Sequence, residues 1–198
     1  MLKRAGRCAA WVVALKHFGW LRKGDADVLD VNLMISNGGD TNRLRDIASS
    51  AATQIAHHFT YELGQPVTFA NWDYRRDAPG VVPAGKLAAR SLAMVEQCEC
   101  LLAIFGPTVP NITSQEVIRF LERRQAGERV DFWLFLNPDE KGPDHDQFLY
   151  DVTKRFGIDI VWSGYRDELE FQGKVMTTLF GFLTQRVFTR QLVIAGPQ

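Results

Sequence analysis

Cysteine is scarce in this chain, and long apolar runs are absent from it. Its 198 residues include three cysteines, Cys8, Cys98 and Cys100, and none of them belongs to a CxxC pair. Cys98 and Cys100 are too close in sequence for a relaxed disulfide with each other, and no zinc-ligand set accompanies them. We therefore expect reduced thiols and a cytosolic protein. No stretch of 18 apolar residues occurs, so no transmembrane segment is expected.

An excess of charge of either sign is also absent. Lys and Arg together number 23, as do Asp and Glu, and the formal net charge is +0 at pH 7. A neutral chain has no overall attraction for duplex nucleic acid, which we exclude as an expected partner. The hydrophobic fraction of 46% and the charged fraction of 23% are typical of a globular domain. A chain of this length forms one domain with a core of its own.

The motifs of several large enzyme classes are missing. Neither GxGxxG nor GxxxxGK[ST] occurs, which disfavours a Rossmann dehydrogenase and a P-loop kinase. The GxSxG elbow of serine hydrolases is absent as well. His57 and His58 are adjacent on an expected helix and point in different directions, so they cannot both ligate one metal ion. We expect no metal site.

Short β-rich runs alternate with helical stretches between about residues 26 and 190. This alternation predicts an α/β domain with a parallel sheet and helices on both faces. Five strands most simply give the flavodoxin-like order 2-1-3-4-5. The first helix is expected to be capped by Asp40 or Thr41 and closed by Gly64. The expected strands cover residues 28–35, 67–72, 100–105, 131–136 and 158–162, and the later helices cover residues 85–97, 113–125, 144–156 and 167–188.

Two terminal segments lie outside this expected domain. Residues 1–25 contain an apolar run with basic residues on both sides and no cleavage site of the small-x-small type. We interpret them as an extra N-terminal amphipathic helix that covers a sheet edge or a partner, and a helix on a membrane surface is the alternative. Residues 191–198 are expected to form a tail.

Polar, glycine-containing loops follow several of the expected strands. In sheets of this kind ligands bind beyond the carboxyl ends of the strands, where the strand order reverses. Helix N-termini point their free N–H groups into the same space, which suits phosphate or carboxylate. Alternative roles stay open, because Ser36-Asn37-Gly38-Gly39 also fits a capped turn and Asp73 and Arg75 also fit a solvated charged loop. The candidate ligand contacts are Ser36, Asn37, Trp72, Asp73, Arg75, Gly106, Thr108 and Ser114.

Glu116 has two interpretations. It lies near the start of the helix that follows the apolar third strand, where its carboxylate would face the expected crevice. It also follows Thr113 by three residues, which matches a capping box in which the glutamate folds back on the helix start. The two interpretations differ in where the side chain points.

Four parts of the sequence resemble one family. They are the first strand with its Asp- and Arg-bearing helix, the stretch from Trp72-Asp73 to the strand ending at Gly106, the run Thr113-Ser114-Gln115-Glu116, and the run from Tyr165 to Phe171 before the last helix. Together they resemble a TIR-like domain, and most closely the uncharacterised TIR-related domain of bacterial signalling and conflict proteins. Nucleoside deoxyribosyltransferases are similar too, with a glutamate at the start of the equivalent helix.

The resemblance implies a pocket for a nucleotide or nucleoside. Glu116 stands where TIR NAD hydrolases carry their glutamate, so the resemblance implies cleavage of an N-glycosidic bond, with NAD or a related nucleotide as substrate or ligand and no separate cofactor. In that role Ser36 and Asn37 would contact ribose or phosphate, and Trp72 would stack on a base. Two alternatives are a non-catalytic homotypic interaction module that forms a homo-oligomer, and a nucleotide sensor. A separately encoded signalling partner is expected in each case.

Overall fold

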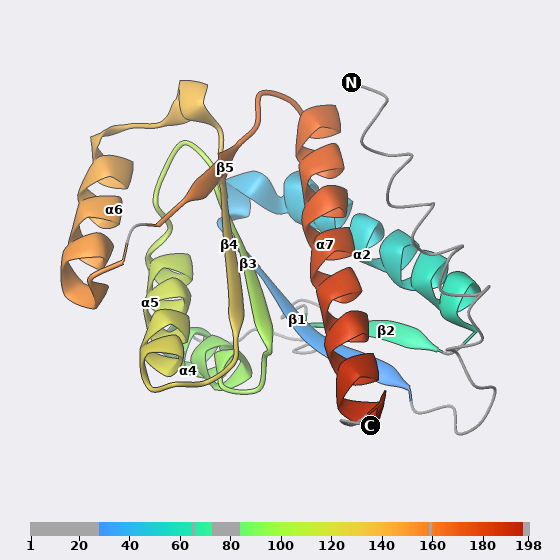
Figure 1. The fold of residues 1–198 in the computed structure, drawn as a ribbon. Coiled ribbons are helices and arrows are strands. Elements are labelled where there is room, and N and C mark those ends of the chain that lie inside the picture. The colour runs from blue at the N-terminus through green and yellow to red at the C-terminus, as the bar shows by residue number, and fades with distance from the viewer. Residues whose placement is uncertain (1–27, 65, 73–83, 159, 196–198) are drawn as a thin grey trace.

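The fold is a five-stranded, all-parallel sheet in the order β2-β1-β3-β4-β5 (Figure 1). A computed structural model describes residues 28–64, 66–72, 84–158 and 160–195. The predicted α/β class and strand order are confirmed. The strands are β1 Leu29–Asn37, β2 Val67–Trp72, β3 Cys100–Phe105, β4 Asp131–Leu136 and β5 Trp162–Gly164.

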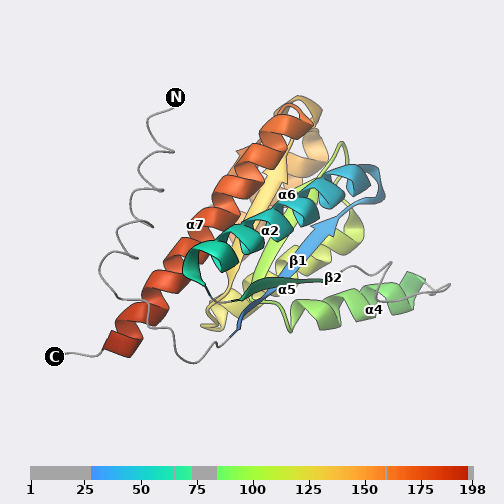
Figure 2. The same ribbon diagram turned by 90° about the vertical axis from the view of Figure 1, so that its right-hand side faces the viewer.

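Helices cover both faces of the sheet, as predicted. α2 and α7 lie side by side on one face, and α4, α5 and α6 lie on the other (Figures 1 and 2). α2 begins after Thr41, whose side chain makes no capping hydrogen bond, and it is closed by Gly64 in the left-handed conformation (φ 67°). The helical segments are η1 Gly39–Thr41, α2 Asn42–Leu63, α4 Ala84–Val95, α5 Asn111–Gln125, η2 Pro138–Glu140, α6 Pro143–Phe156 and α7 Glu168–Ala195.

β1 separates two hydrophobic clusters because its side chains alternate between the two faces. Leu33 and Ile35 pack into the cluster under α2 and α7, whereas Met34 joins the cluster under α4 and α5. Ser36 is two residues beyond Met34 and therefore belongs to the same face as Met34. This alternation places a polar side chain under α4 and α5 at the carboxyl end of β1.

The carboxyl ends of the central strands lie at the same end of the sheet. Asn37 at the end of β1 pairs with Ile104, and Phe105 at the end of β3 pairs with Leu136 at the end of β4. The loops after β1 and β3 diverge there, because β1 is followed by a helix on one face and β3 by a helix on the other. The strand order thus reverses at this point, as the flavodoxin-like prediction requires.

The fifth strand differs from its prediction. It covers only Trp162–Gly164, and these residues pair with the last residues of β4. The expected range 158–162 was wrong because Gly157 ends α6 in the left-handed conformation and the chain reaches the sheet only at Trp162. Val161, which is 87% exposed, does not join the ladder.

The predictions for the two ends of the chain have different outcomes. α7 continues to Ala195, so residues 191–195, which were expected to belong to a tail, are helical. The expected N-terminal helix, residues 1–25, lies outside the described residues. None of the helices in the described parts of the chain combines the length and apolar character needed to cross a membrane.

Cys98 and Cys100 are free thiols buried beside the central strand. Burial raises the pKa of the Cys98 thiol to about 12, and burial raises the pKa of Cys100 well above its usual value. Both side chains are therefore protonated and pack as small apolar groups.

Candidate functional site

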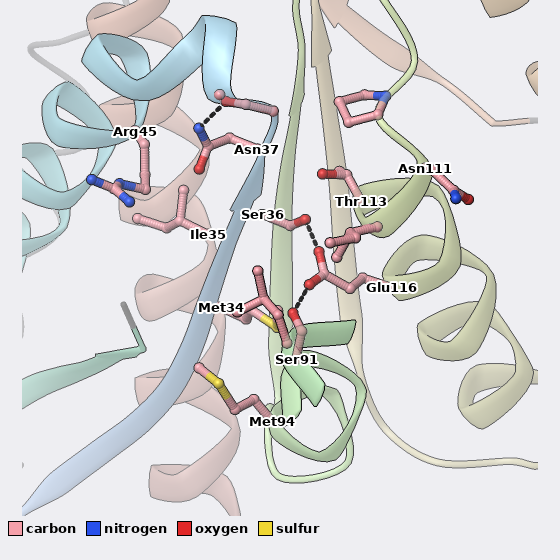
Figure 3. Close-up of a pocket in the computed structure, with 15 residues that line it drawn as sticks. Met34, Ile35, Ser36, Asn37, Arg45, Ser91, Met94, Asn111, Thr113 and Glu116 are labelled. Carbon is pink, nitrogen blue, oxygen red and sulfur yellow. Dashed lines mark hydrogen bonds between the residues drawn. The ribbon is translucent and has the colours of Figure 1, made fainter. Parts of the chain in front are cut away.

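A pocket of about 290 Å³ lies where the strand order reverses. It is enclosed by the end of β1, the loop into η1, the inner face of α4 and the first turns of α5. Figure 3 shows these elements converging on Glu116. The residues that line the pocket are Met34, Ile35, Ser36, Asn37, Gly38, Gly39, Arg45, Leu87, Ser91, Met94, Pro110, Asn111, Ile112, Thr113 and Glu116.

Glu116 is the central acid of this pocket, and it is only 3% exposed. The hydroxyl of Ser36 donates a hydrogen bond to Oε2 of Glu116, and the hydroxyl of Ser91 donates one to Oε1 (Figure 3). β1 and α4 therefore each fix one oxygen of a carboxyl group that α5 supplies. The side chain of Glu116 thus extends from α5 toward Ser36 and Ser91 (Figure 3).

The capping-box interpretation of Glu116 is wrong. α5 begins at Asn111, two residues earlier than expected, with Pro110 as its N-cap and no side-chain capping hydrogen bond. Thr113 is thus already inside the helix, and the hydroxyl of Ser114 donates to the carbonyl of Pro110 at 2.5 Å. The glutamate lies beyond the first turn, where it has no helix end to cap.

Burial raises the pKa of the Glu116 carboxyl to about 7, and the hydrogen bond from Ser36 opposes this increase only in part. Near neutral pH the carboxyl therefore exists in both its protonated and ionised forms. Such a group can hold a ligand hydroxyl, exchange a proton or stabilise a developing positive charge.

The rim of the pocket is a tight turn after β1. The Asn37 side chain donates to the carbonyl of Gly38 at 2.5 Å and to Oδ1 of Asn42 at 3.3 Å. A Cβ on Gly38 would lie 2.5 Å from Oδ1 of Asp40 and 2.7 Å from Cγ of Pro110. A side chain at residue 38 would therefore force its neighbours to shift, because the turn packs against the start of α5.

Three buried polar residues of the pocket wall, Arg45, Ser91 and Thr113, were not predicted from the sequence, and neither was the exposed lining residue Asn111. Arg45 is buried and donates to Oδ1 of Asp46 at 2.8 Å. One signal was present for Arg45, because it stands three residues before the buried Ala48 and so falls on the apolar side of α2. A charged residue on a buried helix face is unusual enough to mark a site.

Three predicted ligand contacts lie outside the lining of this pocket. Gly106 follows β3, and a Cβ there would come within 2.7 Å of the Thr41 side chain. Thr108 is exposed, with its hydroxyl 3.4 Å from Oδ2 of Asp40, and the Ser114 hydroxyl is engaged with its own helix. Ligand contact by these three residues stays a prediction. The side chain of Trp72 and the whole of Asp73 and Arg75 lie outside the described residues.

His145 is fully buried and fastens the loop after β3 to the start of α6. The backbone N–H of Gly142 donates to Nδ1 of His145 at 3.0 Å, which leaves Nε2 to donate to the carbonyl of Gly106 at 2.9 Å. Its ring therefore has a structural role. Within the described residues, no group of three or more His, Cys, Asp or Glu side chains could hold a metal ion.

Comparisons with known proteins do not assign the chain to a family. No protein-family model matches the chain, and no curated protein matches it. Crystal structures of S. aureus homoserine dehydrogenase at pH 6.5, 7.0 and 8.5 are similar in part, with TM-scores of 0.38, 0.39 and 0.40 and sequence identities of 9%, 10% and 9%. The match covers 69% to 70% of this chain and 32% to 33% of those chains, so this chain spans about one third of their length. A likeness of this degree carries no conclusion about function.

Proposed function

We propose that this chain is a nucleotide-processing domain of the TIR-like type, in which Glu116 acts on the N-glycosidic bond of NAD or a related nucleotide. The observation that carries the proposal is the burial of a single carboxyl group in the wall of a pocket of about 290 Å³ at the point where the strand order reverses. The hydroxyls of Ser36 and Ser91 hold that carboxyl. The resemblance of the sequence to TIR-like domains supports the same role.

The proposed reaction is hydrolysis. The bond between C1′ of the ribose and the ring nitrogen breaks, and the electron pair leaves with the ring, which is neutral nicotinamide when NAD is the substrate. The sugar becomes oxocarbenium-like, and the ionised Glu116 carboxylate stabilises this positive charge and holds the ribose hydroxyls. Water then adds its oxygen to C1′ and releases a proton. Asn37 contacts the rest of the ribose or a phosphate at the rim.

Replacement of the acid tests this function directly. We expect Glu116→Gln to reduce loss of NAD by at least about a hundredfold, since the neutral amide cannot stabilise the cationic transition state. The matched control is Glu168→Gln, because Glu168 forms a surface ion pair with Arg43 on the opposite side of the sheet. Equal rates in wild type and Glu116→Gln would contradict the role given to Glu116.

The second candidate is a homotypic interaction module without catalysis. One observation favours it: β5 contributes three residues at an edge of the sheet, and Val161 beside it is 87% exposed. Failure of concentrated wild-type protein to consume NAD, together with concentration-dependent self-association, would favour this candidate. The cytosolic location, the oligomer and a signalling partner stay predictions.

A further inference from the structure

We propose that the apolar part of the pocket, formed by Met34, Leu87 and Met94, is a binding subsite for an uncharged aromatic ring. The ring is the uncharged base of a nucleoside ligand, or the neutral nicotinamide that cleavage of NAD releases. This inference rests on the proposed function for the identity of the ligand, but the subsite itself rests on the side chains described here.

The pocket is divided into a polar part and an apolar part. Met34 and Ser36 alternate along β1 so that both face the pocket, and Leu87, Ser91 and Met94 follow one another at spacings of four and three along α4. In Figure 3, Met34 and Met94 lie on one side of Glu116, and Asn37 and Thr113 lie on the other. Each of these two elements therefore supplies a hydroxyl to Glu116 and an apolar side chain to the space beyond it.

Both methionines have a mixed environment. Met34 is 4% exposed and Met94 is 8% exposed, and both belong to the hydrophobic cluster under α4 and α5. Both also line the cavity, so part of each side chain has no described residue packed against it. Close packing is the rule in protein interiors, and a gap beside two buried apolar side chains forfeits dispersion contacts that a ligand restores.

Methionine is chemically suited to a flat ring. Its thioether is polarizable, its chain adapts to the shape of a ligand, and contact of sulfur with an aromatic ring is favourable. No lining residue of this part carries a charge, and Arg45 and Glu116 are the only ionisable groups among the described lining residues. The subsite thus favours an uncharged planar ring by shape and dispersion.

The positions of the two parts also set the orientation of the ligand. Glu116 lies between the methionines and the rim residue Asn37 (Figure 3). A nucleoside whose ring contacts Met34 and Met94 therefore places its sugar beside the carboxyl group and its remaining groups at the rim. A pocket of about 290 Å³ is at the small end for ligand sites, which fits one nucleoside unit.

Methyl NMR of methionine tests this subsite. The chain has four methionines, Met1, Met34, Met94 and Met176. Met176 packs in the cluster on the opposite face of the sheet and serves as an internal control. In protein labelled at the methionine methyl carbons, we expect nicotinamide and adenosine to shift the Met34 and Met94 signals through the ring current of the bound aromatic group, and to leave Met176 unchanged. Ribose, which has no ring current, is the matched probe. The Met34→Leu and Met94→Leu variants assign the signals.

Two substitutions measure the energetic part of the proposal. Met94→Leu keeps an apolar side chain of similar volume and removes the sulfur, so we expect nicotinamide and adenosine to bind about twofold to tenfold more weakly. Met94→Trp fills the space and is expected to abolish binding, whereas Met176→Leu should leave it unchanged. Met94→Leu is conservative enough to keep the measurement valid if Met94→Trp does not fold.

The outcomes separate this inference from the proposed function. Shifts of Met34 and Met94 together with no NAD loss would support the subsite and overturn the catalytic role of Glu116. NAD loss that depends on Glu116, with no shift of either methionine by nicotinamide or adenosine, would overturn the subsite alone. If neither NAD loss nor a shift of Met34 and Met94 is observed, both the subsite and the catalytic role of Glu116 are overturned.

Discussion

The two ends of α5 each bury a charged side chain, but they surround it with opposite kinds of partner. Glu116, near the start of the helix, is 3% exposed and accepts hydrogen bonds from two neutral hydroxyls. Arg123, two turns later, is 8% exposed and donates to the carbonyls of Val95 and Cys98 and to the carboxylate of Glu128. The same helix thus carries one buried charge with an ionic partner and one without.

The difference separates the structural role of Arg123 from the catalytic role that we propose for Glu116. Arg123 fastens the end of α4 to α5, and its guanidinium also lies 5.5 Å from the centre of the Phe120 ring. Hydrogen bonds from Arg123 lower the pKa of the Glu128 carboxyl, so this pair stays charged. At Glu116 burial dominates and raises the pKa to about 7. A buried acid whose charge is left uncompensated is costly for folding and typical of a site selected for chemistry.

The largest expected effect on stability comes from removing the contacts of Arg123 near the C-terminal end of α5. Arg123→Ala removes the guanidinium donor of the Cys98 carbonyl and one of the two donors of the Val95 carbonyl, and it removes the contact with the Phe120 ring. We therefore expect the free energy of unfolding to fall by about 4 kcal/mol, measured by urea denaturation. Arg119→Ala is the matched control, because Arg119 lies on the same helix and forms only half-exposed ion pairs with Glu96 and Glu122. If the two variants lose equal stability, Arg123 is not the clamp described here.

The next largest effect is the contribution of Glu116 to stability, which depends on pH. The folded-state pKa of Glu116 is about 7, above its ordinary value of 4.5, so the folded protein holds this proton more tightly than the unfolded chain does. The contribution of Glu116 to stability is therefore lost as the pH rises from about 4.5 to about 7, by about 3 kcal/mol in total. Glu116→Gln cannot ionise and has no such loss.

The measurement is the difference in unfolding free energy between Glu116→Gln and wild type at several pH values from 5 to 8. We expect this difference to grow in favour of the variant with increasing pH, because every other titrating group cancels in the comparison. The variant is then the more stable protein at pH 8 and the less active one. A difference that stays constant with pH would mean that Glu116 is ionised throughout this range in the folded state.

Much of the fold could be predicted because its signals are local. The apolar strand Cys100–Phe105 is buried on both faces, and glycine closes α2 at the expected residue. The fifth strand could not be located by the same reasoning, since the apolar residues 158–162 precede and only partly overlap the segment that pairs with β4. Apolar character alone does not decide which residues of a run reach a sheet edge.

The site was predictable only in part, for a different reason. Glu116 and Ser36 could be named because both stand at strand and helix ends that the topology brings together. Ser91 could not, because its role depends on where α4 lies against β1 and α5, and a serine in a helix has no distinctive pattern. The choice between a cap and a pocket acid for Glu116 also depended on a helix start displaced by two residues.

The smallest expected effect tests how the functional end of α5 is positioned. A Cβ at Gly38 would meet the Asp40 carboxylate and the Pro110 ring, whereas a Cβ at Gly39 would meet no atom within 4 Å. We therefore expect Gly38→Ala to lower the unfolding free energy by about 2 kcal/mol, because the Pro110 ring at the start of α5 is a rigid neighbour. Gly39→Ala should leave stability nearly unchanged.

Thermal unfolding measures both effects, and the methyl signals of Met34 and Met94 report whether the pocket shifts. Because Arg123 is anchored at the far end of the helix, the disturbance should stay at the Glu116 end. Equal effects of the two alanines would show that the turn does not press on α5, and that the carboxyl of Glu116 is positioned by its two serines alone.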